Sequence, residues 1–544
     1  MESKARLTRP FLFIPVFLSR MFCSPEFYLF ILVSCISFYH VSQSISVTKY
    51  LLYMGMTDMV NSYYLYHHSF RDFFFQTGVF HPGNSESGWR TFFYLYPLFV
   101  YCDLLGGLSF ERLYYFTIIS SLCALILFYW WVRRIAGREA AWWMFYFFGL
   151  SSIFQEFARS GSYDIFSLLV AIAWIMYFFQ FLNEEKPFRE YLIFGLLTGG
   201  VWFYYGMLRT FFLAVLVHIL FTKDKRRNAF FFLSGMGLVI APSIGLLMWQ
   251  HSAGANAYID RENIFNVVNH HLSDFLMVIH NNVIIFLNRM FGEYDHIEMI
   301  HLDRIHAHFH HPLLSIPLIV GICVTLRRKT TQLPFLVLIF LIYLTPMMTS
   351  SWGFYEARRS VLCLIPNYFF IGIGMKEIFL EVQRVFNRHL RRLLFSIIFG
   401  CIFIICYQEV SFFKTHILNA TRDPGLLKLS DDIKKNHFSG KLLYLEEKTY
   451  YLDTPGSDML RISLLQNGKC IPDVVGLELA DVVPKGLNQF YIVISPEISQ
   501  KVFLKWCIEN KIDPGKIVYQ EPLVNMPNAM NKGAFFRLYN AKIK

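Results

Sequence analysis

Long apolar runs recur between Pro25 and Tyr407, and they constrain the fold of this 544-residue chain more than any other feature. A helix needs roughly 20 mostly apolar residues to cross a bilayer. Charged residues make up only 16% of the chain and hydrophobic residues 55%, which is more apolar than a soluble domain of this length requires. The sequence therefore predicts a polytopic α-helical membrane protein.

We expect about eleven transmembrane helices from the length of these runs. Their predicted ranges are 25–47, 110–132, 140–157, 163–182, 191–203, 207–221, 229–250, 313–325, 334–349, 361–375 and 393–407. The first residues show no small-residue cleavage pattern, so we interpret them as an uncleaved end. Because the predicted number is odd, the two termini are expected on opposite sides of the membrane.

Basic residues set the expected orientation. Lys and Arg are several times denser in the connections that share a side with the N-terminus, as in "KDKRR" at 223–227. The positive-inside rule places that side in the cytoplasm, and it explains the net charge of +11 without a nucleic-acid partner. We expect a multi-pass protein of the cytoplasmic (inner) membrane with a cytoplasmic N-terminus.

The composition changes near residue 410. Residues 1–410 are predicted to form a transmembrane module with two long outer loops, at 48–109 and 251–311. Residues 411–544 have the composition of a soluble domain: "KLLYLEE" and "QFYIVIS" predict short buried strands and "SQKVFLKWCIENK" predicts a helix. This alternation indicates a small C-terminal α/β domain on the extracytoplasmic face.

Ionisable residues at a membrane boundary are costly unless they are paired or hydrated, which makes each one a candidate for function. On the expected topology the candidates gather at the outer membrane face. They are Asp58, Arg159, Asp164, Arg209, Arg358 and Arg359. Their convergence at one face, more than any single residue, indicates a site.

Each of these candidates also has a structural alternative. Asp58 can cap the helix that follows it. Arg159 and Asp164 can form a structural ion pair, and the two arginines at 358 and 359 can bind lipid headgroups.

Histidines concentrate between His251 and His311, above all in "DHIEMIHLDRIHAHFHH". We favour a solvated loop in which one or two histidines bind an acceptor, with His308 as the residue to test. The alternative is a divalent metal ion held by oxygen and nitrogen ligands if the segment bends round the site. Its ligands would be Asp295, Glu298 and His301, whose spacing matches no recognised zinc pattern.

Six weak motifs follow one another in a moderately specific order. They are "TDMVNSYYLYHHSF", "FYLYPLFVYCDLLGGLSFERLYYF", "ARSGSYDIFSLL", "YLIFGLLTGGVWFYYG", "HAHFHHPLLSIPLIVG" and "ARRSVLCLIPNYFFIGIG". Over residues 25–380 this order resembles the GT-C superfamily of polyprenyl-phosphate-sugar-dependent glycosyltransferases, particularly the protein O-mannosyltransferase and aminoarabinose transferase branch. Met59 stands where that family commonly has a second acidic residue.

The resemblance implies an inverting transfer in which an acceptor hydroxyl or amine attacks the anomeric carbon and polyprenyl phosphate leaves. Asp58 would be the general base and Asp164 would orient Arg159. The donor phosphate would be bound by Arg159, Arg209, Arg358 and Arg359, and the acceptor by His308 and Tyr96. The expected partners are membrane lipid, a polyprenyl-phosphate-linked sugar, and an acceptor protein, lipid or glycan.

Two other functions stay open at this point. A transporter or flippase of lipid-linked precursors is one, although such proteins often show repeated halves and ionisable groups near the bilayer midplane, which this sequence lacks. An inactive GT-C-like scaffold whose outer domain recruits envelope enzymes is the other, and Met59 keeps it open.

Overall fold

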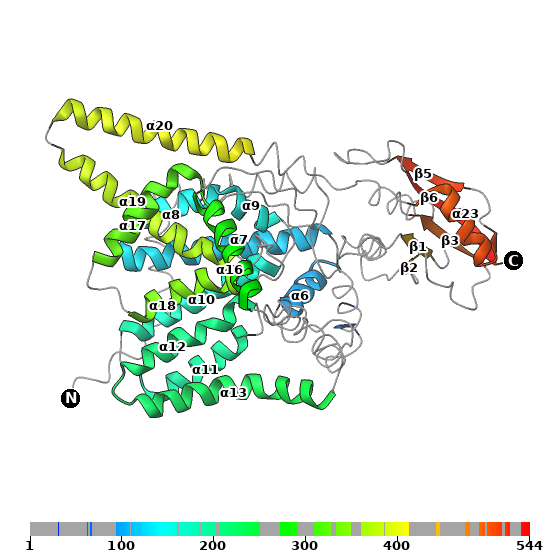
Figure 1. Ribbon diagram of the computed structural model, residues 1–544, viewed down its shortest axis with the longest axis horizontal. Helices are drawn as coiled ribbons and strands as arrows, with labels where there is room; N and C mark the ends of the chain where they lie inside the picture. Colours follow the sequence, from blue (N-terminus) through cyan, green and yellow to red (C-terminus); the bar gives the residue numbers. More distant parts are fainter. Residues whose placement is uncertain are drawn as a thin grey trace.

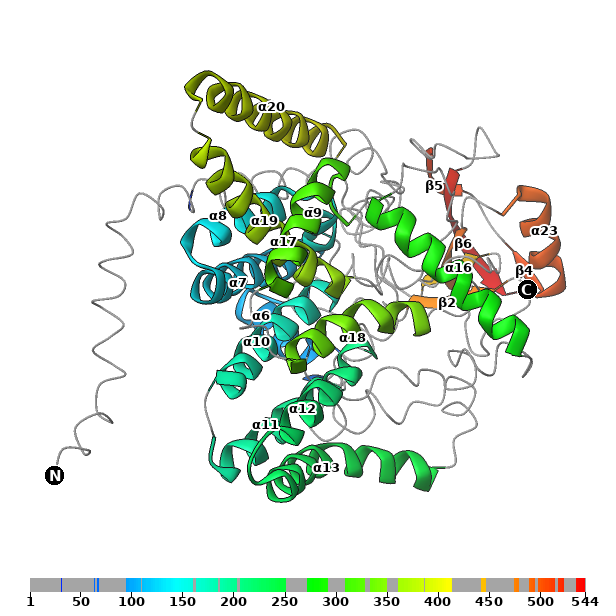
Figure 2. The same cartoon turned by 60° about the vertical axis from the view of Figure 1, so that its left-hand side comes forward.

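The structure is a computed structural model of the whole chain. It describes residues 31, 63, 66–67, 94–108, 110–159, 163–183, 186–202, 206–250, 272–291, 309–327, 333–349, 361–385, 387–412, 442–446, 474–478, 489–494, 498–513, 517–522 and 535–543. Figures 1 and 2 show a helical bundle, with a small sheet at the end of the molecule away from the α19–α20 turn.

Helices make up nearly all of the described residues before residue 413. Up to the middle of the bundle they are α6 (Tyr96–Leu104), α7 (Phe110–Ala136), α8 (Arg138–Leu150), α9 (Ser152–Arg159), α10 (Tyr163–Asn183), α11 (Phe188–Trp202), the 3₁₀ helix η2 (Gly206–Thr210), α12 (Phe211–Leu220) and α13 (Lys225–Gln250). The rest are α16 (Leu272–Phe291), the 3₁₀ helix η3 (Pro312–Leu314), α17 (Ser315–Arg327), α18 (Leu333–Thr349), α19 (Leu364–Arg384) and α20 (Arg388–Phe412).

Several of these helices are apolar enough to cross a bilayer. In the described part of the chain, four have the length and composition of a span: Arg112–Ala136, Ile165–Leu182, Val361–Arg384 and Arg388–Ser411. Shorter apolar helices cover Leu208–Leu220, Leu276–Asn288, Pro312–Arg327 and Leu333–Met347. These are the helices of a multi-pass membrane protein, while the number of about eleven spans stays a prediction.

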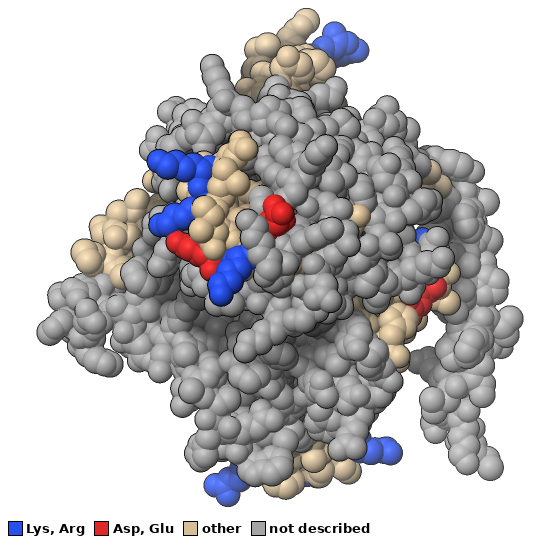
Figure 3. Space-filling model, turned by 90° about the vertical axis from the view of Figure 1, so that its right-hand side faces the viewer, with Lys and Arg blue, Asp and Glu red and all other residues tan. Residues whose placement is uncertain are grey.

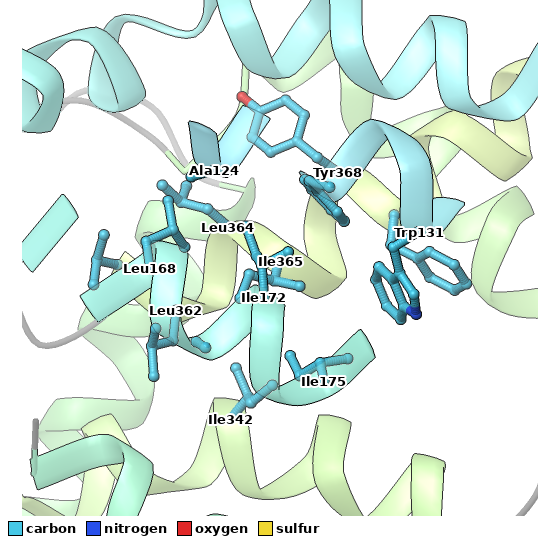
Figure 4. Close-up of a cluster of buried hydrophobic side chains, with 14 of the residues drawn as sticks. Ala124, Trp131, Leu168, Ile172, Ile175, Ile342, Leu362, Leu364, Ile365 and Tyr368 are labelled. Atoms are coloured by element: carbon cyan, nitrogen blue, oxygen red, sulfur yellow. The ribbon is translucent and has the colours of Figure 1, made fainter. Parts of the chain in front are cut away.

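Helix α19 lies at the centre of the bundle. Every residue from Leu364 to Met375 is buried, as expected for a helix that is apolar on all sides. The Trp131 ring of α7 stacks on Phe369 of α19 with centroids 5.1 Å apart. Figure 4 shows side chains from α7, α10, α18 and α19 meeting in this core.

Helix α20 is equally apolar but lies outside the bundle. Only 6% of its most apolar window is buried, against 83% for the span that contains α19. Because an exposed apolar helix of this length has no stable place in water, its outer surface is suited to lipid. Figures 1 and 2 both show α20 as a separate rod beside α19.

Glycines let two helix pairs pack with their backbones in contact. A Cβ atom on Gly374 of α19 would lie 1.8 Å from the carbonyl oxygen of Pro317 on α17, and one on Gly321 would lie 1.9 Å from that of Phe370. Between α11 and α13, a Cβ atom on Gly235 would lie 2.2 Å from the Leu192 carbonyl oxygen. Such small residues are typical of helix contacts inside membranes.

The structure departs from the expected helices in two places. The single span expected at 140–157 is broken at Ser151, whose backbone is extended, so that α8 ends and α9 begins there. The outer connection expected at 251–311 contains the 20-residue helix α16. That helix tolerates the buried Asn282 because its side-chain amide donates to the Met347 carbonyl of α18 at 2.9 Å.

A mixed sheet follows the bundle. Its strands are β1 (Leu442–Glu446), β2 (Val474–Glu478), β3 (Gln489–Ile494), β4 (Ile512–Asp513), β5 (Ile517–Pro522) and β6 (Phe535–Ile543), with helix α23 (Gln500–Glu509) between β3 and β4. The order is β2-β1-β3-β6-β4, with β1 parallel to both neighbours and β6 antiparallel to β3. β1, β3 and α23 confirm the two strands and the helix expected there.

Helix α23 covers this sheet through a core of its own. Phe503, Trp506 and Cys507 of the helix pack against Leu443 and Ile492 of the strands. The side chain of Ser499 caps the helix by accepting from the Val502 N–H, which satisfies one of the free donors of the first turn. The domain boundary at residue 410 stays a prediction.

The two neighbouring glycines of α13 give a test of the helix packing. Gly235→Ala should destabilise the folded protein by about 1–3 kcal/mol, because the new methyl group meets backbone atoms that cannot move aside. Gly237→Ala is the matched control: nothing lies within 4 Å of the added atom, so the melting temperature should stay or rise slightly. Equal melting temperatures for the two variants in detergent would contradict this packing.

Candidate functional site

Helix α6 lies in the first long connection, expected at 48–109. Pro97 lies in its first turn, where its missing N–H costs nothing. The helix ends at two glycines with positive φ, Gly106 at 99° and Gly107 at 110°, a backbone conformation that other residues rarely adopt. This turn places Asp103 on the last helical turn, and the guanidinium of Arg112 donates to the Gly107 carbonyl.

Asp103 collects donors from the segment that precedes α6. The hydroxyl of Tyr63 donates to its Oδ1 at 3.1 Å, and His67 Nε2 lies 3.4 Å from the same oxygen. Tyr63 is 4% exposed, whereas the side chains of His67 and Asp103 are 46% and 31% exposed. The cluster therefore joins a buried hydrogen bond to a polar pair that solvent or a ligand can reach.

The phenols of this cluster stay protonated at neutral pH. Burial, and then the negative charge of Asp103, raise the pKa of Tyr63 well above its usual range. The same two causes raise the pKa of Tyr66 to about 12. Both side chains are therefore neutral hydrogen-bond donors wherever the protein is folded near physiological pH.

Tyr96, a predicted acceptor-binding residue, lies beside this cluster. Its half-buried ring is edge-on to that of Tyr66, with centroids 5.4 Å apart. Tyr66 in turn contacts Phe99 of α6 at 5.7 Å. Half-exposed aromatic rings next to a carboxylate and an imidazole offer both an apolar face and hydrogen-bonding groups, which suits a polyhydroxylated ligand.

Aromatic contacts bring Tyr94, two residues before α6, to the N-terminal parts of α7 and α10. The ring of Tyr94 contacts Phe116 of α7 at 5.9 Å and Phe166 of α10 at 5.7 Å. Helix α9 also packs against α7 and α10. Arg159 is the last residue of α9 and Asp164 the second of α10. The structure describes the backbone of both residues, and their side chains lie outside the described part.

Arg209 is exposed at the turn between α11 and α12. It closes η2, and its Nε donates to the Trp202 carbonyl at 3.4 Å. The hydroxyl of the next residue, Thr210, lies 3.0 Å from that of Thr345, which fixes the turn to α18. The main neighbours of η2 are thus α11, α12 and α18. The expected proximity of Arg209 to Arg159 stays a prediction.

The remaining predicted site residues lie outside the described residues. They are Asp58, Arg358, Arg359, His308, Asp295, Glu298 and His301. Within the described ranges no group of three His, Cys, Asp or Glu side chains is arranged to hold a metal ion. The predicted metal ligands are not among those residues, so the metal stays a prediction.

The histidine that follows Phe309 is part of the core. His310 is 1% exposed, and its Nε2 lies 3.2 Å from the Ser315 hydroxyl of α17. Its Nδ1 lies 3.5 Å from the amide nitrogen of Asn367, whose oxygen accepts from the Tyr343 hydroxyl at 2.5 Å. An amide nitrogen can only donate, so Nδ1 is the acceptor and Nε2 carries the proton. This histidine ties α17, α18 and α19 together.

Sequence reasoning missed Asp103, His67 and Tyr63. Asp103 had a signal: it is a carboxylate in the apolar stretch "YPLFVYCDLLGG", directly before the glycine turn. Its two donors lie 36 and 40 residues earlier. Pairing at that separation follows from the fold and not from local sequence.

The whole chain has the fold of known membrane glycosyltransferases. The sequence matches no family model, and no curated protein matches it significantly. In structure it matches ArnT from Cupriavidus metallidurans bound to undecaprenyl phosphate, with a TM-score of 0.57 and 12% identity over 95% of this chain and 98% of that one. The apo form of ArnT gives a TM-score of 0.53. An Archaeoglobus fulgidus oligosaccharyltransferase crystallised with Zn and sulfate gives 0.51 with 12% identity, over 93% of this chain and 72% of the other.

These proteins define the class of fold. ArnT is an aminoarabinose transferase, and it and the oligosaccharyltransferase belong to the GT-C superfamily. The resemblance drawn from the sequence motifs is thereby confirmed at the level of the fold.

The Asp103 cluster gives a second test of the structure. Asp103→Leu should destabilise the protein by about 1–3 kcal/mol, because the buried Tyr63 hydroxyl loses its acceptor. Asp103→Asn keeps a carbonyl oxygen and should cost less. Asp224→Asn, at an exposed pair with Arg227, is the control and should change the melting temperature little. If all three variants melt alike, the Tyr63 hydrogen bond is not stabilising.

Proposed function

We propose that the chain is an integral-membrane glycosyltransferase that moves a sugar from a polyprenyl-phosphate carrier to an acceptor on the extracytoplasmic face. The observation that carries this proposal is the fold shared with ArnT over 95% of the chain. It is supported by the packing of α6, α9 and α10 against α7 and by the contact of Tyr94 with Phe166, which lies two residues after Asp164 in α10.

The basic residues support the proposed orientation. Arg133 and Arg134 lie in the last turn of α7, about 30 Å along the helix from the end that α6 contacts. By the positive-inside rule their end is cytoplasmic and the α6 end is outward. Figure 3 shows the end of the molecule that carries the sheet, where the described acidic and basic side chains are mixed. In α23, Lys505 and Glu509 form an ion pair at 3.8 Å.

The proposed reaction needs a base and fixed positive charge. The acceptor oxygen or nitrogen forms a bond to the anomeric carbon as the bond from that carbon to the phosphate oxygen breaks, and Asp58 takes the acceptor's proton. Polyprenyl phosphate leaves with the electron pair, and guanidinium groups at Arg159, Arg209, Arg358 and Arg359 stabilise its charge. In this scheme Asp164 orients Arg159, and Tyr96 with His308 contacts the acceptor.

Undecaprenyl phosphate is the probe that tests the donor site, because it is the carrier without its sugar. Arg159→Gln should weaken its binding to the purified full chain about tenfold or more, which is the loss expected for one charge-assisted hydrogen bond. Arg226→Gln, at the start of α13 and on the proposed cytoplasmic side, should bind like the unmodified protein. Unchanged binding in the Arg159 variant would remove this residue from the phosphate site.

The proposed base has a different signature. Asp58→Asn should bind undecaprenyl phosphate normally but transfer sugar about 10²- to 10⁴-fold more slowly, since only proton removal is lost. The donor for this assay is the lipid that copurifies with the protein, identified by mass spectrometry. Full transfer by the variant would exclude Asp58 as the base. A protein that binds no polyprenyl phosphate at all would point to the scaffold alternative.

A further inference from the structure

The outer end of α20 is attached to the bundle through a single helical turn. Within that turn the Cys406 thiol lies 2.9 Å from the Tyr146 hydroxyl of α8, and the side-chain oxygen of Gln408 accepts from His311. The third contact in this turn is made by the carboxylate of Glu409, which binds α9. Most other described residues of α20 are half or fully exposed, so these contacts hold an otherwise lipid-facing helix.

Glu409 contacts the first residue of α9. Its Oε2 accepts from the backbone N–H of Ser152 at 2.8 Å. That N–H belongs to the first turn of α9, where helix donors have no partner within the helix. A carboxylate at this position also interacts favourably with the positive end of the helix dipole. Ser151 and Ser152 are 2% and 5% exposed, so this donor has little access to water as a substitute partner.

Helix α9 is too short to hold its own direction. It has eight residues, a length of about 12 Å, and isolated helices of fewer than about 12 residues are marginal. Its buried residues Ile153, Phe154 and Phe157 fix one face. The Gln155 amide donates to the Gly149 carbonyl at 3.1 Å, which closes α9 onto α8. Glu409 therefore fixes the beginning of a rod whose last residue is Arg159.

We propose that Glu409 is a positioning residue for the donor-phosphate site, acting through α9 on Arg159. The inference rests on the proposed function, which gives Arg159 its phosphate. Glu409 lies 250 residues after Arg159 and does not touch the substrate in this scheme. A lipid-facing helix thereby sets the direction of α9 and, with it, the backbone position of Arg159.

The test removes each half of the hydrogen bond separately. Glu409→Leu deletes the acceptor, and Glu409→Gln keeps a side-chain carbonyl oxygen in its place. Ser152→Pro deletes the donor side of the contact, which is the backbone N–H together with the Ser152 hydroxyl that also hydrogen-bonds Glu409. Proline is favoured at the first helical position, and Ser151 before it already has the extended backbone that proline requires, with φ −60° and ψ 126°. Together these variants remove the contact from either side.

Binding of undecaprenyl phosphate to the purified full chain is the measurement. Glu409→Leu and Ser152→Pro should each weaken binding about three- to tenfold, the range of coupling within one contact network, and Glu409→Gln should restore most of it. In an Arg159→Gln background the same changes should have no further effect. This non-additivity is the readout that a merely structural role would not produce.

Gln408→Leu is the matched control on the same helical turn. It removes the hydrogen bond from His311 to residue 408 and leaves the hydrogen bond between Glu409 and α9, so binding of undecaprenyl phosphate should be unchanged. An equal loss in this variant would show that attachment of α20, and not the direction of α9, matters, and would overturn the inference. Normal binding by both Glu409→Leu and Ser152→Pro, with weak binding by Arg159→Gln, would overturn it while leaving the proposed function intact. Normal binding by Arg159→Gln would remove both.

Discussion

The backbones of α17 and α19 touch where Gly321 and Gly374 face each other, and the rest of the bundle is arranged round that contact. In hydrocarbon no hydrophobic force draws helices together, so close backbone approach and interhelical hydrogen bonds must do so. Gly372 lets α8 approach α19 in the same way, since a Cβ atom there would lie 2.4 Å from the Ala140 carbonyl oxygen. With α19 enclosed, the surrounding helices have fixed directions.

Polar side chains then fix the connections between these helices. Asn367 and His310 link three helices through one buried chain of hydrogen bonds, and Glu409 links α20 to α9. A polar group left without a partner in an apolar environment costs several kcal/mol, so each such bond strongly favours one arrangement of the chain around it. The helix ends are thus fixed by polar contacts, and the helices are held along their lengths by apolar contacts.

What the sequence could predict follows from this division. Unbroken apolar runs predicted α10 to within one residue and α7 except for its last four residues, because the signal for a long buried helix is local. The break at Ser151 follows Gly149 by two residues, but Glu409, which accepts from the Ser152 N–H, is 257 residues away from it in the chain. Helix α16 was missed because Asn282 interrupts its apolar run, and the carbonyl that satisfies this amide lies 65 residues later. Long-range hydrogen bonds of this kind leave no mark in a single sequence.

The same reasoning applies to the site. The motifs marked Tyr96, Arg159 and Asp164 as site residues, and their shared role stays a prediction. The structure puts the Tyr96 ring beside that of Tyr66, and it puts Arg159 and Asp164 at the end of α9 and the beginning of α10. Asp103 is visible in the sequence as a carboxylate in an apolar stretch, but its contacts with Tyr63 and His67 required the fold.

A TM-score of 0.57 at 12% identity shows how little of this scaffold depends on particular residues. Helix packing in lipid requires small residues at crossings and apolar volume between them, and many sequences meet those conditions. The chemistry instead requires particular charges at particular points, and helix packing does not dictate them. Function belongs to such grafted sites more than to the fold that carries them. Differences in substrate among chains with this scaffold should therefore depend on residues in the connections between helices and on short elements, such as α9, that fix the positions of those connections.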